Sequence, residues 1–307
     1  MIQGISGSTA LAGVLGDPVR HSLSPAMHNA ALAELGLDWA YLALPVAPAD
    51  LATVVRALEA LDCRGLSVTL PHKHAVAALA AELTPLARRI GAVNTLVRRP
   101  EGGWLGTNTD MEGFLAPLRE EGAGAEGWQG RTALVLGCGG SARAVVAGLV
   151  ELGLERIQVA GRREAALAAF LESCREWAPE LEAVAWGEDG VAGVLGTALE
   201  TAVAASDLVV NTTPVGMARG GDPGASDACP LTAAELERLA TGATVYDLIY
   251  VPRPTALLRQ AAARGCRTVD GLEMLVQQGA ASLRLWSDLA EVPVAAMRRG
   301  ALAQLVG

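Results

Sequence analysis

Residues 132–144 read TALVLGCGGSARA, an apolar stretch that runs directly into a glycine-rich turn. The turn has the spacing Gly137-x-Gly139-x-x-Ala142, and apolar residues then recur at helical spacing. A strand, this glycine pattern and a helix, in that order, form the phosphate-binding start of a Rossmann-like unit. The first glycine permits a tight turn, and the second lets a pyrophosphate approach the backbone, where the helix N-terminus offers free N–H groups. We therefore predict a dinucleotide site at this turn.

The chain beyond this turn alternates between short apolar runs and segments of helical periodicity. We expect strands at 132–136, 156–160, 208–211, 243–248 and 268–270. The expected helices are one that starts at Ser141, a long one after residue 160, and two more at 232–239 and 254–263. This alternation is typical of a parallel sheet that is covered by helices on both faces.

The residues before the turn show the same alternation on a smaller scale. We expect strands at 11–15, 39–46, 64–70, 92–97 and 104–106. We expect helices at 25–35, 48–61, 71–83 and 109–121. The glycine-rich stretch 122–130 is the best internal domain boundary. The tail is expected to form two helices, 272–286 and 293–306, whose position the pattern leaves open.

Composition narrows the function classes. The chain has 307 residues, 51% of them hydrophobic, which suits one large or two ordinary domains with substantial cores. No uninterrupted apolar run reaches membrane-spanning length and no basic leader precedes an apolar segment, so we expect a cytoplasmic protein without membrane contact. The net charge of -9 argues against nucleic-acid binding. The five cysteines lack metal-site spacing, so no metal is expected.

The strand after the glycine turn indicates which dinucleotide is bound. NAD sites usually end this strand with an acid, whereas NADP sites place arginine there. Here the strand is followed by Gly161-Arg162-Arg163, and guanidinium groups suit a 2′-phosphate. We therefore predict NADP. Glu164 leaves NAD open as an alternative, since its carboxylate could accept from a ribose hydroxyl and repel a phosphate.

The segment Gly16–Pro25, GDPVRHSLSP, follows the first expected strand. Ser24 is expected to cap the next helix, with Pro25 at its first helical position. The hydroxyls of Ser22 and Ser24 would then lie near a helix N-terminus, which favours an anion. The pattern fits either a site for a small carboxylate or a simple helix cap.

The stretch Leu70–Ala75, LPHKHA, contains the only lysine of the chain, Lys73. His72 and His74 flank it but point to different sides of a helix, which argues against a shared metal. Other polar side chains follow expected strands at Thr69, Asn94 and Asp110, and open α/β sheets bind ligands at strand ends. If Asp110 meets Lys73, the two form a pair that is suited to proton transfer.

These residues belong to a set of longer motifs. The motifs are GDPVRHSLSPAMHN (16–29), SVTLPHKHA (67–75), GAVNTL (91–96), GTNTD (106–110), LGCGGSARA (136–144), VVNTTPVGM (209–217), YDLIY (246–250) and DGLEMLVQQGA (270–280). In this order and over nearly the whole chain, the sequence resembles the shikimate dehydrogenase family. The resemblance implies reversible, NADPH-dependent reduction of 3-dehydroshikimate to shikimate in aromatic amino-acid (chorismate) biosynthesis.

The resemblance also implies an architecture. It assigns residues 1–110 and 271–307 to an α/β substrate domain with a mixed, mainly parallel sheet, to which the C-terminal helices return. It assigns residues 111–270 to a Rossmann-like NADP-binding domain. A monomer or a homodimer is expected, with a small-molecule substrate as the partner.

Site residues carry over by motif. The resemblance implies Lys73 and Asp110 as the catalytic pair. It implies that the substrate is bound by Ser22, Ser24, Thr69, Lys73, Asn94, Asp110, Tyr250 and Gln278. It implies that the cofactor is bound by Gly137, Cys138, Gly139, Gly140, Ser141, Ala142, Arg162, Arg163, Asn211, Thr212, Thr213, Met217, Leu248, Gly271 and Met274.

Two alternatives follow from departures within this family. The family's cofactor loop commonly reads Asn-Arg-Thr, and here only Arg162 of Gly161-Arg162-Arg163 matches it. Glu164 stands near where dual-cofactor quinate/shikimate relatives carry an acid. A quinate/shikimate dehydrogenase that uses NAD is therefore one alternative. The other is a relative that senses quinate or shikimate without catalysis, although such a protein could dispense with Lys73 and Asp110.

Overall fold

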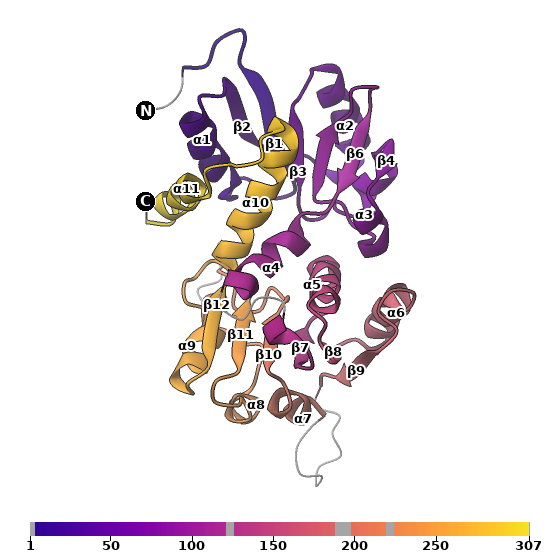
Figure 1. Cartoon of the computed structure of the whole chain (residues 1–307), viewed down its shortest axis with the longest axis vertical. Coiled ribbons are helices and arrows are strands. Elements are labelled where there is room, and N and C mark those ends of the chain that lie inside the picture. Colours follow the sequence, from indigo (N-terminus) through magenta and orange to yellow (C-terminus); the bar gives the residue numbers. More distant parts are fainter. Residues whose placement is uncertain (1–3, 121–125, 188–197, 219–223, 307) are drawn as a thin grey trace. The chain divides into compact units, whose positions relative to one another are not determined.

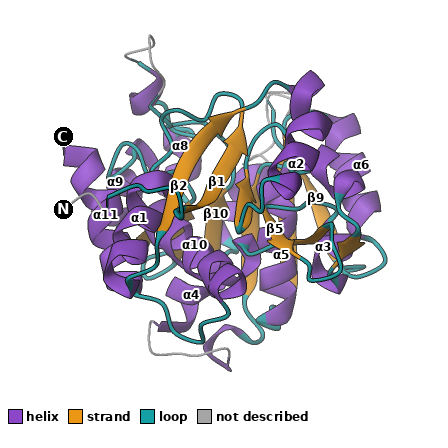
Figure 2. Ribbon diagram, turned by 90° about the horizontal axis from the view of Figure 1, so that it is seen from above, coloured by secondary structure: helices purple, strands orange, loops and turns teal. Residues whose placement is uncertain are grey.

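The computed structural model describes residues 4–120, 126–187, 198–218 and 224–306 (Figure 1). The chain forms two compact units, Met1–Gly113 with Leu275–Gly307, and Phe114–Met274. The backbone passes from one unit to the other within α4 (Asp110–Glu120) and returns within α10 (Gly271–Ser287). Each unit contains a sheet with helices against it, so the expected α/β class is confirmed; Figure 2 separates strands from helices by colour.

The first unit contains a mixed sheet in the order β2-β1-β3-β5-β6-β4. Its strands are β1 (Ala10–Gly16), β2 (Trp39–Pro45), β3 (Gly65–Val68), β4 (Glu82–Leu83), β5 (Thr95–Arg98) and β6 (Trp104–Thr107). β1 pairs in parallel with β2 and β3, whereas β5 runs antiparallel to both β3 and β6. Because β5 is reversed, its first residues lie beside the carboxyl ends of β3 and β6.

The helices of this unit pack on an apolar interior. They are α1 (Ser24–Leu35), α2 (Leu51–Ala60), α3 (Pro85–Ile90) and α11 (Val294–Val306). The last of them, α11, lies against α1, where Gly300 allows close approach because a Cβ there would stand 2.5 Å from the Ala26 carbonyl oxygen. The C-terminal helix therefore packs within the first unit.

The second unit contains a parallel sheet in the order β12-β11-β10-β7-β8-β9. Its strands are β7 (Thr132–Leu136), β8 (Arg156–Gly161), β9 (Leu181–Ala185), β10 (Leu208–Asn211), β11 (Thr244–Asp247) and β12 (Arg267–Asp270). Its helices are α5 (Gly140–Glu151), α6 (Glu164–Cys174), α7 (Ala198–Ala204), α8 (Ala233–Glu237) and α9 (Ala256–Ala263).

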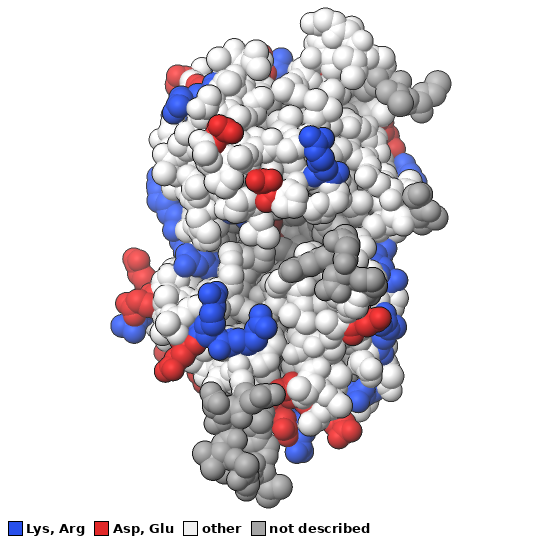
Figure 3. All heavy atoms as spheres, turned by 180° about the vertical axis from the view of Figure 1, so that it is seen from behind, with Lys and Arg blue, Asp and Glu red and all other residues white. Residues whose placement is uncertain are grey.

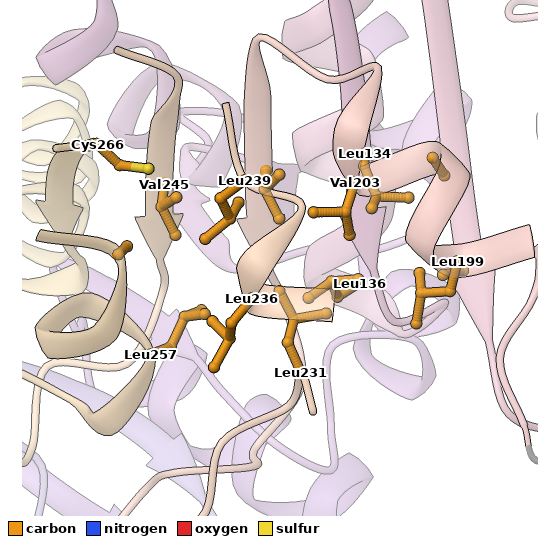
Figure 4. Packing of buried hydrophobic residues seen from close by; sticks show 14 of the residues in the cluster. Leu134, Leu136, Leu199, Val203, Leu231, Leu236, Leu239, Val245, Leu257 and Cys266 are labelled. Carbon is orange, nitrogen blue, oxygen red and sulfur yellow. The ribbon is translucent and has the colours of Figure 1, made fainter. Parts of the chain in front are cut away.

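Burial on both faces explains why these strands read as nearly continuous apolar runs. Leu134 and Leu136 of β7 are fully buried, and Figure 4 shows them in one cluster with Val203 of α7 and Val245 of β11. Strand order reverses between β7 and β10, because β8 and β9 continue on one side and β10 to β12 on the other. Open α/β sheets bind ligands at the carboxyl ends of strands around such a reversal.

Three local predictions were wrong. Residues 71–83 form turns, a 3-10 helix (Ala75–Leu79) and strand β4 in place of one helix. The long helix expected after residue 160 ends at Cys174, and β9 follows it as an edge strand. Ser24 is the first residue of α1 and not its cap; Leu23 occupies the cap position without a side-chain bond.

Charged side chains of both signs occur on the surface. On the face drawn in Figure 3, most of the area is uncharged, and several Lys and Arg side chains lie next to one another near the middle of the view. Among the described residues, none of the helices has both the length and the apolar character needed to cross a bilayer.

Candidate active site

Backbone and histidine contacts hold the segment that carries Lys73. His72 is buried and donates through Nε2 to the Val46 carbonyl at 2.7 Å. His74 donates through Nδ1 to the Gly91 carbonyl at 2.7 Å, and the Lys73 carbonyl accepts from the Val93 backbone at 2.8 Å. The two histidines therefore hold the backbone of the turn on either side of Lys73 and do not bond to its side chain.

Lys73 and Asp110 meet directly. Nζ of Lys73 donates to Oδ2 of Asp110 at 2.6 Å, and 17% and 9% of the two side chains are exposed. Asp110 begins α4, and its backbone N–H donates to Oδ1 of Asn108 at 3.0 Å. A short, mostly buried, charge-assisted hydrogen bond orients the ammonium group and leaves its other protons available to an acceptor. Lys73 and Asp110 therefore form a direct pair.

Asn94 holds the second oxygen of the same carboxylate. Its Nδ2 donates to Oδ1 of Asp110 at 2.8 Å and to Oγ1 of Thr109 at 3.0 Å. Its Oδ1 accepts from the Thr109 backbone at 2.8 Å and from Oγ1 of Thr95 at 2.9 Å. Ser282 of α10 completes this network, since its hydroxyl lies 2.8 Å from Thr95 and 3.1 Å from Thr109. Thr109 stands in the motif GTNTD that the sequence singled out, whereas Thr95 and Ser282 were not predicted to take part, because hydroxyl residues carry no periodic signal.

Hydroxyl groups surround the carboxyl ends of β1 and β3. Thr69 follows β3, and its backbone N–H donates to the Leu15 carbonyl at 2.9 Å, which ties it to β1. A side chain at Gly16 would stand 2.5 Å from Cγ2 of Thr69, so the two segments are in close contact. Ser22 lies in the loop after β1, and its hydroxyl accepts from the Ser24 backbone at 3.2 Å. The structure therefore places Ser22, Ser24 and Thr69 in adjoining segments.

Two buried hydroxyls near Ser24 were not predicted. Burial raises the pKa of the Tyr41 phenol, which the neighbouring hydroxyls of Ser67 and Ser24 partly offset. Within the described residues, neither the Tyr41 nor the Ser67 hydroxyl has a hydrogen-bond partner of good geometry. Buried polar groups without partners are uncommon, so these two hydroxyls are available to a water molecule or a ligand. Tyr41 also stacks on His28 with ring centroids 4.1 Å apart.

The remaining predicted substrate residues come from the later part of the chain. Gln278 of α10 lies in the first unit, where its Oε1 is 3.4 Å from Nδ2 of Asn94. Tyr250 follows β11 in the second unit, and burial raises the pKa of its phenol. The structure thus brings Gln278 to the Asn94 network, while Tyr250 belongs to the unit that contains the glycine turn.

The glycine turn is tight at Gly137 and open at Gly139. Gly137 has φ +104°, and a Cβ there would stand 2.7 Å from Oγ1 of Thr212. Gly139 precedes α5, and a Cβ there would meet no atom within 4 Å. Ala142 is fully buried where α5 leaves the sheet. Open space in front of a glycine at a helix N-terminus suits a pyrophosphate, so these residues fit a dinucleotide.

The arginines after β8 are accessible. Arg162, Arg163 and Glu164 are all exposed, and α6 begins at Glu164. Gly161 is buried, and a Cβ there would approach Leu167 at 3.2 Å and Sγ of Cys138 at 3.4 Å. The two guanidinium groups thus stand at the carboxyl end of β8, the strand next to β7, where a bound dinucleotide would place its ribose phosphate.

The other predicted cofactor residues line the carboxyl ends of β10 and β11. Asn211 ends β10, and Thr212 donates through Oγ1 to the Leu136 carbonyl at 2.8 Å. The Leu248 backbone N–H donates to the Asn211 carbonyl at 3.1 Å. A Cβ at Gly271 would stand 2.0 Å from the Leu248 carbonyl oxygen. The structure brings together Asn211, Thr212, Thr213, Leu248 and Gly271; Met217 is partly exposed nearby in the chain, and Met274 is buried.

Comparison with known proteins gives the same relationship over the whole chain. Residues 14–96 match the model of the shikimate dehydrogenase substrate binding domain, and residues 271–301 match that of the shikimate 5'-dehydrogenase C-terminal domain. The chain is 48% identical over 301 residues to the shikimate dehydrogenase (NADP(+)) of Synechococcus sp. (strain JA-2-3B'a(2-13)), which covers 98% of each protein.

Solved structures show the same similarity over nearly the whole chain. Shikimate 5-dehydrogenase from Thermus thermophilus, in complex with NADP(H) and shikimate, has 36% identity and a TM-score of 0.80 over 96% of this chain and 100% of that one. Quinate dehydrogenase from Corynebacterium glutamicum, in complex with NAD, has 31% identity and a TM-score of 0.81 over 96% and 99%. With its motifs, its fold and its full-length relatives in agreement, the chain belongs to the shikimate dehydrogenase family.

Proposed function

We propose that this protein catalyses the reversible, NADP-dependent reduction of 3-dehydroshikimate to shikimate, a step of aromatic amino-acid (chorismate) biosynthesis. The observation that carries this proposal is the pairing of Lys73 with Asp110 at 2.6 Å, at a strand edge rich in hydroxyl and amide groups. NADPH supplies the hydride when it is bound. Relatives that are 48% identical to this chain are named for this activity and this cofactor.

Lys73 and Asp110 have separate parts in the reaction. As the ketone carbon accepts a hydride, its oxygen develops negative charge and needs a proton. The Lys73 ammonium donates a hydrogen bond to that oxygen and then the proton. Asp110 holds the ammonium in place through Oδ2. An arginine at position 73 would bind the oxygen but would not release a proton in the working pH range.

The hydroxyl and amide groups bind the substrate. Ser22 and Ser24 donate to its carboxylate, which fits the α1 N-terminus at Ser24. The ring hydroxyls are bound by Thr69, Asn94, Asp110 and Gln278, and Tyr250 lies near the substrate. Asn94 and Gln278 already share a contact at 3.4 Å, so one hydroxyl could replace it and bond to both.

The glycine turn and the arginines bind the cofactor. Gly137 to Ala142 hold the pyrophosphate against the α5 N-terminus. Arg162 and Arg163 hold the 2′-phosphate, and the nicotinamide lies against Asn211, Thr212, Thr213, Met217, Leu248, Gly271 and Met274. We further propose a cytoplasmic location and a monomer or homodimer.

A second candidate is a quinate dehydrogenase that uses NAD. The observation that favours it is Glu164, an exposed carboxylate beside Arg162 and Arg163 that could accept from a ribose hydroxyl. The structural likeness to a quinate dehydrogenase in complex with NAD is consistent with this candidate. The two arginines favour NADP over it.

The test is to supply shikimate or quinate with NADP⁺ or NAD⁺ and to follow the absorbance of the reduced nicotinamide. The proposal requires the highest kcat/KM with shikimate and NADP⁺, and its loss in the Lys73→Ala variant. Higher kcat/KM with quinate and NAD⁺ would establish the second candidate instead. If no pair is turned over while shikimate still binds, the chain is a sensor without catalysis.

A further inference from the structure

Asp247 joins three segments at the carboxyl edge of the parallel sheet. It ends β11, and its Oδ1 accepts from Nδ2 of Asn211 at 3.0 Å and from the Ile249 backbone at 3.1 Å. Its Oδ2 accepts from Oγ1 of Thr255 at 2.7 Å, and Thr255 caps α9. One carboxylate thus links the end of β10, the loop after β11 and the start of α9.

The orientation of Asn211 depends on this carboxylate. A carboxylate only accepts hydrogen bonds, so the Asn211 amide must turn its Nδ2 toward Asp247 and its Oδ1 away. That Oδ1 accepts from the Thr213 backbone at 3.0 Å and from Oγ1 of Thr213 at 2.8 Å. Oγ1 of Thr213 in turn accepts from the Val215 backbone at 3.2 Å. Asp247 and the Thr213 backbone N–H together therefore fix the direction of the bonds in the turn after β10.

The buried charge of Asp247 is costly to keep. Asp247 is fully buried, and burial raises the pKa of its carboxyl to about 6 although three donors surround it. Asp270 on β12 raises it further, and among the described residues no cation pairs with Asp247. A raised pKa means that the ionised form costs folding free energy at neutral pH. Groups that are kept at such a cost are often functional.

We propose that Asp247 is a positioning residue for hydride transfer: its carboxylate fixes Asn211 and the loop after β11, and so fixes the walls of the nicotinamide subsite. This inference rests on the proposed function, which places the nicotinamide against Asn211, Thr213 and Leu248. Asp247 itself touches neither ligand. It acts through the orientation of the segments that do.

The test variant is Asp247→Asn, which keeps the shape and removes the charge. One side of the new amide is a donor. Facing Asn211 it opposes another donor, and facing Thr255 it makes that hydroxyl the acceptor and leaves the hydroxyl proton without the oxygen to which it now donates. The turn after β10 is then no longer held in one arrangement, and kcat with shikimate and NADP⁺ should fall about tenfold or more, since small displacements of reacting groups are costly.

Two further measurements separate positioning from general damage. The inhibition constant of 2′,5′-ADP, which occupies only the adenosine half of the site, should be unchanged, and Tm at pH 7 should be unchanged or higher. The matched control is Asp207→Asn: Asp207 lies before β10 at the opposite edge of the sheet, where its Oδ2 accepts from the Thr132 backbone at 2.9 Å. The Asp207→Asn variant should retain full kcat.

Several results would overturn the inference. A wild-type kcat in Asp247→Asn would mean that the residue has no role in positioning. A Tm that falls together with 2′,5′-ADP affinity, or failure of the variant to fold, would mean that its role is structural. A failure of the proposed function is distinguishable, because the unmodified protein would then not reduce NADP⁺ with shikimate in the first place.

Discussion

Lys73 and Asp110 form a short polar contact at the strand edge of the first unit, 2.6 Å from Nζ to Oδ2, with both side chains mostly buried. The lysine comes from the turn after β3 and the aspartate from the first residue of α4. A contact between residues 37 positions apart in the chain exists only because β3, β5 and β6 are neighbours in the sheet.

The Lys73→Ala variant should lose roughly 10²–10⁴-fold in kcat, the range that general acid–base groups contribute, with a modest change in KM. Lys73→Arg should be nearly as poor, because a guanidinium keeps its proton. Steady-state kinetics with shikimate and NADP⁺ measure both. Retention of most of the activity in Lys73→Arg would exclude the proton-transfer role.

The Asn94→Ala variant should destabilise the first unit. It removes the donor to Asp110 and the acceptor for the Thr109 backbone and the Thr95 hydroxyl, all of which are buried. Buried groups that lose their partners cost about 1–3 kcal/mol each, so the free energy of unfolding should fall by about 2 kcal/mol or more. Denaturant unfolding tests this, with Thr84→Ala as a control that removes a partly buried cap hydroxyl of α3; an Asn94 variant no less stable than the control would contradict it.

Protein stability should depend on pH through His28. This residue is fully buried, and burial lowers the pKa of its imidazole from 6.5 to about 4. The folded-state pKa lies below the unfolded value, so the stability is complete above pH 6.5 and is lost as the pH falls toward 4. As the pH falls from about 7 to about 5, His28 alone should lower the free energy of unfolding by about 2 kcal/mol, because one pKa unit corresponds to about 1.4 kcal/mol.

Replacement of His28 by phenylalanine isolates that contribution. The variant keeps a ring to stack on Tyr41 but has no group that titrates, and it loses the bond from Nδ1 to the Ser24 carbonyl. Its stability at pH 7 should therefore be lower, while its loss between pH 7 and pH 5 should be smaller than in the unmodified protein. Equal pH dependence in the two proteins, measured by denaturant unfolding, would assign the titration elsewhere.

Alanine at the two turn glycines should have opposite effects. Gly139→Ala should fold with unchanged Tm, because its Cβ meets no protein atom, but should weaken NADPH binding where the pyrophosphate lies. Gly137→Ala should lower Tm, because it forces φ +104° on a residue whose Cβ would stand 2.7 Å from Thr212. Tm measurements and NADPH fluorescence titration compare the pair; unchanged NADPH affinity in Gly139→Ala would place the pyrophosphate elsewhere.

The choice between NADP and NAD should respond to single charges after β8. Arg162→Gln should reduce the ratio of kcat/KM for NADP⁺ over NAD⁺ by about tenfold or more, because charge-assisted bonds to phosphate are strong. Glu164→Gln should raise the same ratio, since it removes a negative charge beside the phosphate. A ratio unmoved by Arg162→Gln would exclude this residue from the 2′-phosphate site.

The glycine turn of the second unit could be predicted from the sequence because the residues that form it are close together in the chain. The strand, the turn of Gly137 and Gly139, and the start of α5 follow one another within a few residues, and each has a steric reason. The missed strand β9 shows the limit of this reasoning, because its burial pattern is partly exposed and it lies at the sheet edge. Edge strands lack the continuous apolar run that makes buried strands visible.

The contacts around Asn94 in the first unit were less predictable, because they depend on β5 running antiparallel to its neighbours. Asn94 directly precedes β5, and the antiparallel pairing places it between Thr69 and Asp110, which follow β3 and β6. The pattern of residues 92–97 does not indicate in which direction the strand runs relative to its neighbours. The segment 71–83 was predicted wrongly for the same kind of reason, because the bonds from His72 and His74 to distant carbonyls replace those of a helix.

The sequence by itself determined the kinds of groups that are present: one lysine, an acid at a helix start, a glycine turn and paired arginines. Local sterics and charge decide these features, and neighbouring residues are enough to read them. Only the tertiary structure decided which groups meet. The bonds of Asp110 to Lys73 and Asn94, and of Asp247 to Asn211 and Thr255, join segments that sheet order and burial bring together. Long-range contacts form because the whole core excludes water, and no single segment encodes that.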